Sequence, residues 1–127
     1  MTDVVVFVLK RWWPLDAPRN GQFDCYNAIK IGEKTSEWRN ASDFWKKRLL
    51  NSHGLQTLQW AHEIKNRSKP LFLQDFPDYQ WKSNLAILVV GHTKYPRLVA
   101  SIKAIIYHSE TNQFEIQIKG VLEELRE

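Results

Sequence analysis

The chain has 127 residues, 43% of them hydrophobic and 25% charged, which predicts one globular domain and argues against a disordered chain. The single cysteine, Cys25, excludes an internal disulfide framework. Because the apolar runs are too short to span a bilayer and the start of the chain lacks a basic leader, we expect a cytoplasmic protein with no membrane partner. The formal charge is +4, and residues 110–127 are locally acidic, so the rest of the chain is basic, which is compatible with a nucleic-acid or nucleotide partner.

The first third of the chain predicts strand, loop, helix and strand. "VVVFVLK" at 4–10 has the β-branched content of a buried strand, and the proline-containing segment 11–22 predicts a loop. Residues 23–31 are apolar without strict alternation; a strand is the alternative, but the pattern favours a helix that ends at Gly32. "KTSEWR" at 34–39 alternates and predicts a short strand.

Two helices are predicted next. Asn40 is expected to cap the first, Phe44 to lie on its apolar face, and Gly54 to end it. The second is expected over residues 55–66, where apolar side chains recur at helical spacing.

The remaining sequence is mostly of β type. Residues 67–84 predict a loop with a short extended piece at 71–74, and "LAILVVG" from residue 85 predicts a central strand. Segments 97–109 and 114–125 predict two strands joined by a hairpin turn at "ETNQ". We therefore expect a single α+β domain over residues 1–127, with a mixed sheet able to curl into a small barrel.

Polar side chains gather at residues 32–39. On an extended strand, Thr35, Glu37 and Arg39 would share one face and the alternate residues the other. A hydroxyl, a carboxylate and a guanidinium together suit the edge of a base, and Lys34 could reach a phosphate or activate a leaving group. The alternative is an ordinary solvated turn in which Glu37 and Arg39 form a surface ion pair worth less than about 1 kcal/mol.

"FDCYNAIKIGEKTSEWR" resembles the signature of ASCH domains, which belong to the PUA-like superfamily. That signature is an aromatic-started helix followed by Gly-x-Lys-Thr-x-Glu-x-Arg. The matching positions here are Gly32, Lys34, Thr35, Glu37 and Arg39. "SDFWKKRL", "LVVGHTKYPRLVASIKAI" and "FEIQIKGVL" are similar to later family segments, so the resemblance covers most of residues 4–122. The sequence departs from the family in its longer loop at 11–22 and in His92, where many relatives have Tyr.

The resemblance implies a PUA-like small mixed β-barrel with flanking helices and a cleft lined by the motif. It implies binding of RNA, single-stranded nucleic acid or a modified nucleotide. It also implies an alternative function as a hydrolase, either a ribonuclease or an amidohydrolase on a modified nucleoside, with Lys34 and Glu37 as catalytic residues. The family's amidohydrolases use a threonine nucleophile where this chain has Glu37, so here the carboxylate would act as a general base for water. A protein-interaction domain is the third interpretation.

Tryptophan side chains are candidates for stacking on bases, since such contacts are worth about 1–3 kcal/mol. Trp13, Trp38 and Trp81 lie in or beside polar segments, where a stacking face is plausible. Trp45 and Trp60 fall within amphipathic helices and are expected in the core.

Basic residues outside the motif are further candidates. Lys46 and Lys47 follow the motif on the next helix, where they would contact phosphates or form a solvated helix face. His92 and Lys94 would form a cleft wall opposite the motif, or an ordinary turn. The four histidines and one cysteine lack the spacing of metal ligands, so no metal and no other cofactor is expected.

Overall fold

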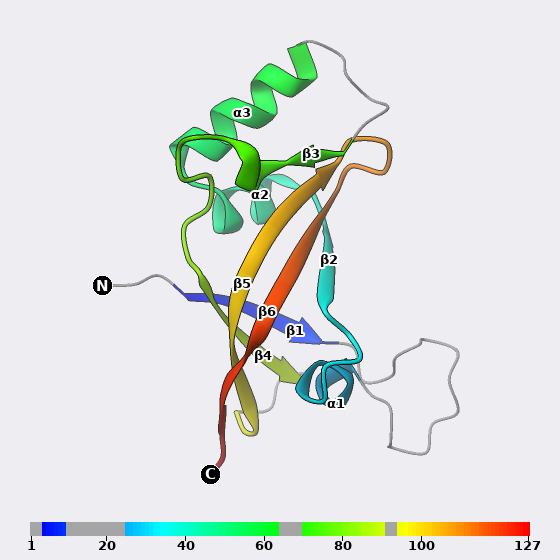
Figure 1. The fold of residues 1–127 in the computed structure, drawn as a ribbon, viewed down its shortest axis with the longest axis vertical. Coiled ribbons are helices and arrows are strands. Elements are labelled where there is room, and N and C mark those ends of the chain that lie inside the picture. The colour runs from blue at the N-terminus through cyan, green and yellow to red at the C-terminus, as the bar shows by residue number, and fades with distance from the viewer. Residues whose placement is uncertain (1–3, 10–24, 64–69, 91–93) are drawn as a thin grey trace.

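The computed structural model describes residues 4–9, 25–63, 70–90 and 94–127. Their strands and helices confirm an α+β chain with few helices (Figure 1). In chain order the elements are β1 (Val4–Leu9), α1 (Cys25–Lys30), β2 (Ser36–Asn40), α2 (Asp43–Leu49), α3 (Ser52–Glu63), β3 (Leu71–Phe72), the 3-10 helix η1 (Leu73–Asp75), β4 (Leu85–Val90), β5 (Arg97–His108) and β6 (Gln113–Leu125).

A six-stranded mixed sheet forms the body of the molecule. Its strand order is β1-β4-β5-β6-β2, with β3 added to β5. β1 and β4 are parallel, and the other pairs are antiparallel. The mixed sheet and the central position of β4 confirm the predictions. The sheet is not closed into a barrel, because β1 and β2 lie at opposite ends of the strand order and share no ladder in the described chain.

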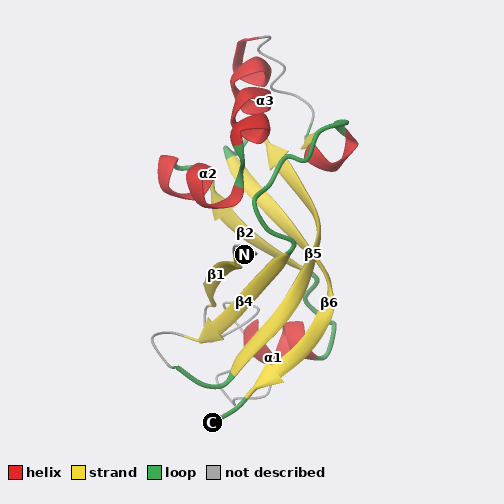
Figure 2. Cartoon of the chain, turned by 90° about the vertical axis from the view of Figure 1, so that its left-hand side faces the viewer, coloured by secondary structure: helices red, strands yellow, loops and turns green. Residues whose placement is uncertain are grey.

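The β5–β6 hairpin runs along the length of the molecule, with α2 and α3 near one end and α1 near the other (Figures 1 and 2). Its register shifts at three places between Val99 and Ala104. Such irregularities bend a strand pair and increase its twist, which curls the sheet. The predicted hairpin at "ETNQ" is confirmed, with Asn112 in the left-handed region at φ 54°.

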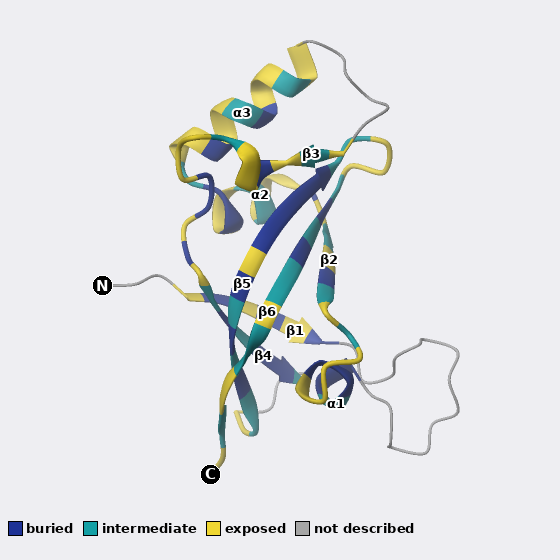
Figure 3. Ribbon diagram, in the orientation of Figure 1, coloured by how far each residue is buried: buried dark blue, intermediate teal, exposed yellow. Residues whose placement is uncertain are grey.

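The hydrophobic core lies against one face of the sheet. Alternate side chains of β1, namely Val5, Phe7 and Leu9, are buried there with residues from β4, β5 and β6 (Figure 3). Val4 and Val8 are exposed on the other face. The prediction of a wholly buried β1 is therefore wrong, because no described residue covers its outer face.

α1 confirms the helix expected between residues 23 and 31. Gly32 has φ +85°, and its N–H donates to the Ile29 carbonyl oxygen over 3.1 Å. Glycine is favoured where a helix ends in this left-handed conformation. Cys25 is buried at the start of α1, as expected.

The boundary between α2 and α3 differs from the prediction. Ser42, not Asn40, caps α2, because Asn40 is the last residue of β2 and pairs with Gln113 of β6. Gly54 does not end α2 but lies inside α3, where its N–H donates to the Asn51 side-chain oxygen over 3.0 Å. The local sequence predicts a helix cap from residue type alone and does not show that Asn40 pairs with β6.

Three aromatic side chains also lie elsewhere than predicted. Phe44 is exposed because the short helix α2 turns Trp45 inward, where its ring stacks on Phe7 with centroids 5.4 Å apart. Trp60 is 47% exposed on α3, so its assignment to the core is wrong. Trp81 is buried, and its indole N–H donates to Asn84 over 3.0 Å, which leaves it no face for stacking on a base.

Candidate functional site

Three charged residues of the motif meet at the start of β2. Glu37 Oε2 lies 3.1 Å from Lys34 Nζ, and Glu37 Oε1 lies 2.8 Å from Arg39 Nη1. The side chains of Lys34, Glu37 and Arg39 are only 10%, 11% and 17% exposed. We call these three residues the ionic cluster. The pair of Glu37 and Arg39 expected on the surface does form, but it is largely buried.

The local backbone explains how Lys34 joins the other two. Glu37 and Arg39 are two residues apart on β2 and therefore share a face. The strand begins only at Ser36, so the prediction that Lys34 points to the opposite face is wrong. The Lys34 N–H donates to the Ala28 carbonyl oxygen over 3.0 Å, and the Lys34 ammonium also donates to the Ser36 carbonyl oxygen. Thr35 is exposed and lies outside the ion pairs.

Arg39 joins the two ends of the sheet. Its Nη2 donates to the Val8 carbonyl oxygen of β1 over 2.9 Å, and its Nη1 also donates to the Trp38 carbonyl oxygen over 2.7 Å. The guanidinium carbon lies 5.2 Å from the ring centre of Phe7 and 5.3 Å from that of Trp45. These are cation–π distances. Arg39 is therefore a structural link between β1 and β2 as well as a motif residue.

The charges of the ionic cluster do not balance. Among the described residues, Glu37 is the only carboxylate within ion-pair distance of Lys34 or Arg39. Two cations against one carboxylate leave one unit of positive charge in a largely buried place, where charge is poorly screened by solvent. Such a place attracts an anion.

Helix α2 lies beside the ionic cluster, because Trp45 contacts Arg39. Lys47 and Arg48 are exposed on this helix, and the Arg48 guanidinium lies 4.3 Å from the ring centre of exposed Phe44. Lys46 is half-buried and faces a hollow lined by side chains of α3. Of the two lysines of α2 that were predicted to contact a ligand, only Lys47 is exposed.

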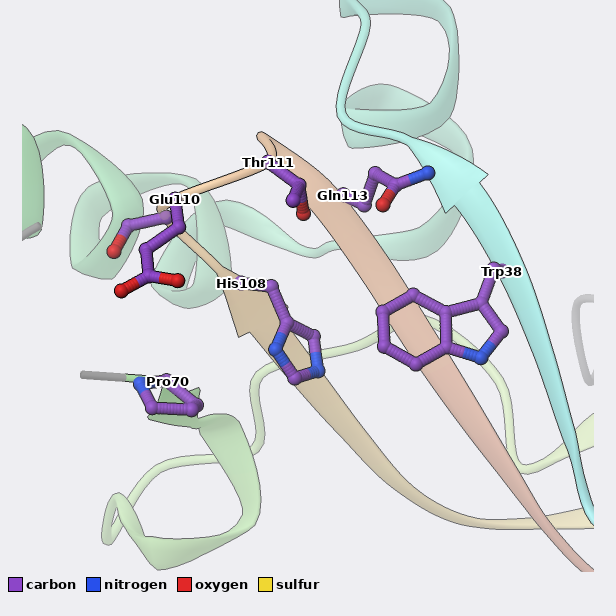
Figure 4. A pocket seen from close by; sticks show the side chains of 7 residues that line it. Trp38, Pro70, His108, Glu110, Thr111 and Gln113 are labelled. Atoms are coloured by element: carbon purple, nitrogen blue, oxygen red, sulfur yellow. The ribbon is translucent and has the colours of Figure 1, made fainter. Parts of the chain in front are cut away.

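Trp38 lies apart from the ionic cluster, although it stands between two of the cluster's residues in the sequence. It is 42% exposed, on the face of β2 opposite Glu37 and Arg39. Its ring lies against His108 of β5, with centroids 4.6 Å apart. Both rings line a cavity of about 290 Å³ that we call the Trp38 pocket (Figure 4). The other lining residues are Pro70, Ser109, Glu110, Thr111 and Gln113.

The remaining residues predicted for the site are Lys94, Trp13 and His92. Lys94 is exposed and lies 5.6 Å from the ring centre of Tyr95, with no described contact to the ionic cluster. Trp13 and His92 lie outside the described residues. Within the described ranges, no three metal-binding side chains gather at one point, and no helix is long and apolar enough to cross a membrane.

Sequence reasoning did not identify His108, Glu110 or Gln113. They become neighbours of Trp38 because β6 pairs with both β2 and β5, which brings the tip of the β5–β6 hairpin beside β2. The alternation of β5 and β6 was visible in the sequence, but the pairing of β2 with β6 was not.

Comparison with known protein families gave no match, and searches of characterised proteins and of solved structures found no significant similarity.

Proposed function

We propose that this chain is a nucleic-acid or modified-nucleotide binding domain of the ASCH type, with RNA as the partner to test first. The observation that carries the proposal is the ionic cluster: the motif's lysine, glutamate and arginine meet at ion-pair distances and keep an excess positive charge. A phosphate-bearing ligand would compensate that charge. The motif's resemblance to the ASCH signature supplies the ligand class.

The surroundings of the ionic cluster support this proposal. Thr35 is exposed beside the cluster, at the point where the chain enters β2, and it offers a hydroxyl. Lys47 and Arg48 on α2 add exposed positive charge, and Trp45 connects that helix to Arg39. The PUA-like barrel implied by the resemblance would close between β1 and β2, and the Arg39 side chain reaches across this gap in the open sheet.

The test is the binding of a fluorescently labelled, single-stranded RNA of about ten nucleotides, followed by anisotropy at several salt concentrations. For single strands each neutralised phosphate contributes about −0.7 to the slope of log K against log [salt]. We expect affinity to fall with salt, and the double variant Lys47→Ala/Arg48→Ala to reduce the magnitude of the slope by about 1.4. Lys34→Met should weaken binding at least tenfold while keeping the salt-dependent contribution of α2.

Arg126→Ala is the matched control, because Arg126 is an exposed cation near the C-terminus, remote from α2 (Figure 1). It should leave the affinity within twofold of wild type. The proposal would be contradicted if the RNA affinity did not change with salt concentration. It would also be contradicted if Arg126→Ala lowered the affinity as much as the α2 double variant does. Absence of any RNA or nucleotide binding would leave the protein-interaction interpretation.

A hydrolase is the second candidate, and the 3.1 Å contact between Lys34 Nζ and Glu37 Oε2 favours it. In this interpretation Glu37 accepts a proton from water and Lys34 donates one to the leaving group. Wild type, Lys34→Ala and Glu37→Gln would be incubated with RNA and with acylated nucleosides, and the products identified by mass spectrometry. Product from wild type alone supports an enzyme, whereas no product from any of the three excludes these substrates.

A further inference from the structure

The Trp38 pocket lies outside the ionic cluster and has a wall prepared for a flat ligand. The Trp38 and His108 rings are tilted by 32° to each other and come from β2 and β5, on either side of β6. Figure 4 shows the two rings side by side, with Pro70 and Glu110 beyond His108. A cavity of about 290 Å³ is close to the lower limit of ordinary small-molecule sites, so a single base or nucleoside fits it in size.

Hydrogen bonds fix the His108 side of this wall and the hairpin tip in the absence of a ligand. His108 Nε2 lies 2.9 Å from Glu115 Oε1, and the other oxygen of Glu115 accepts from Gln117 over 3.1 Å. The hairpin tip is also fixed, because the Tyr107 hydroxyl donates to the Asn112 side chain over 2.8 Å. Preorganisation of this kind lowers the entropy cost of binding.

The pocket offers hydrogen-bond acceptors beside the hydroxyls of Ser109 and Thr111, which can donate or accept. The Glu110 carboxylate accepts only, and His108 keeps Nδ1 as an acceptor when its Nε2 carries the proton toward Glu115. Gln113 carries one acceptor and one donor group in a planar amide. Among the described residues that line the pocket there is no lysine or arginine.

These features together select one class of ligand. An aromatic wall favours a planar ring, and the acceptor oxygens of Gln113 and Glu110 favour a ring that carries donors. Adenine and cytosine each present an amine beside a ring-nitrogen acceptor, the pattern that an amide such as Gln113 can pair with. Uracil has a single N–H between two carbonyl oxygens, so it cannot donate to Gln113 and Glu110 at the same time, whereas an amine has two N–H groups.

We propose that the Trp38 pocket binds an unpaired adenine or cytosine base, stacked on Trp38 and recognised through its amine by Gln113 and Glu110. The inference deepens the proposed function, on which it rests, by adding a base-selective site on the opposite face of β2 from the ionic cluster. The base enters first and its phosphates stay outside, away from Glu110.

The experiment titrates adenosine, cytidine and uridine, which lack phosphate, into the ¹⁵N-labelled chain. Binding is followed by NMR at the Trp38 indole N–H, whose signal is identified by its loss in Trp38→Ala. Adenosine and cytidine should shift this signal with at least tenfold higher affinity than uridine. Gln113→Leu should reduce that preference to threefold or less. Trp60→Ala removes a similarly exposed tryptophan from α3 and should leave both the shift of the Trp38 signal and the nucleoside preference unchanged.

Several outcomes would overturn the inference. They are equal binding of the three nucleosides, no shift of the Trp38 signal at millimolar nucleoside, or a larger shift with N-acetylarginine amide, which would assign the pocket to a peptide. The two proposals can fail separately. If RNA binding depends on salt but is unchanged in Trp38→Ala and Gln113→Leu, only the proposal of a base pocket is refuted. If nucleosides bind at Trp38 but RNA binding does not depend on salt, only the proposed role of the ionic cluster is refuted.

Discussion

Arg39 of β2 donates a hydrogen bond to the carbonyl oxygen of Val8 in β1, over 2.9 Å, although the two strands lie at opposite ends of the sheet. Within the described chain, backbone pairing therefore leaves a gap between β1 and β2, and the Arg39 side chain spans it. A planar guanidinium suits this task because it can donate in two directions at once. The same group neutralises Glu37, so the stability of the curled sheet and the charge of the candidate site depend on one residue.

The first prediction concerns this link. Arg39→Ala removes the bonds to Val8 and Glu37 together and should lower the free energy of unfolding by about 3 kcal/mol. Arg39→Lys keeps the charge but not the fork of donors, so its loss should be intermediate. Urea unfolding curves followed by circular dichroism measure both. If the alanine variant unfolds at the same urea concentration as wild type, the link carries no stability.

The second prediction concerns the balance of the ionic cluster. Glu37→Gln leaves Lys34 and Arg39 close together without a countercharge, and we expect a loss of about 2–4 kcal/mol in unfolding free energy. The double variant Lys34→Met/Glu37→Leu removes the ammonium as well as the carboxylate and should be less destabilised than the sum of its two single variants by about 1 kcal/mol or more. Simple additivity in the same urea experiment would mean that the two residues do not interact in solution.

Local patterns predicted the elements better than they predicted the site. The alternation of β5 and β6 and the glycine at the end of α1 are local features, and the structure confirms both elements. The charged residues of the ionic cluster were also identified, since they are close in the sequence. The direction of Lys34 was not, because it depends on β2 starting only at Ser36.

The Trp38 pocket shows where such reasoning stops. His108 reaches Trp38 only because β6 lies between β2 and β5, and strand order is set by the packing of the whole sheet. The prediction that Asn40 caps a helix is wrong for the same reason. Its side chain suits a cap, but Asn40 is a residue of β2 and pairs with β6. Both errors come from contacts between residues far apart in the sequence.

The third prediction tests the placement of Gly54 inside α3. A Cβ atom on Gly54 would lie 2.1 Å from the Gln80 carbonyl oxygen, a backbone atom, so α3 would have to shift. Gly54→Ala should therefore cost about 1–3 kcal/mol despite the better helix propensity of alanine. Gly120→Ala is the control, since a Cβ atom on Gly120 would meet no atom of the described residues within 4 Å, and alanine should stabilise that strand by about 0.5 kcal/mol. Stabilisation by Gly54→Ala in thermal unfolding would contradict the close contact.

The fourth prediction concerns a carboxylate that joins α1 to the end of β6. Glu124 accepts hydrogen bonds from the Tyr26 hydroxyl over 2.8 Å, from Lys30 over 3.0 Å and from Arg126 over 2.7 Å. The bond from Tyr26, followed by that from Lys30, lowers the pKa of Glu124 from 4.5 to about 2. These bonds favour the charged carboxylate in the folded chain.

A lowered pKa makes this contribution depend on pH in a definite direction. Between the two values the unfolded chain binds a proton more readily than the folded chain, so the stabilisation is complete above pH 4.5 and is lost as the pH falls toward about 2. The difference in unfolding free energy between wild type and Glu124→Gln should thus stay constant from pH 7 to pH 5 and shrink from pH 4.5 to pH 3. Glu123→Gln is the control, because Glu123 forms no ion pair within the described ranges, and its difference from wild type should not follow this course. A difference for Glu124→Gln that stays the same at pH 3 and pH 7 would show that the hydrogen bonds from Tyr26 and Lys30 do not hold α1 to β6 in solution.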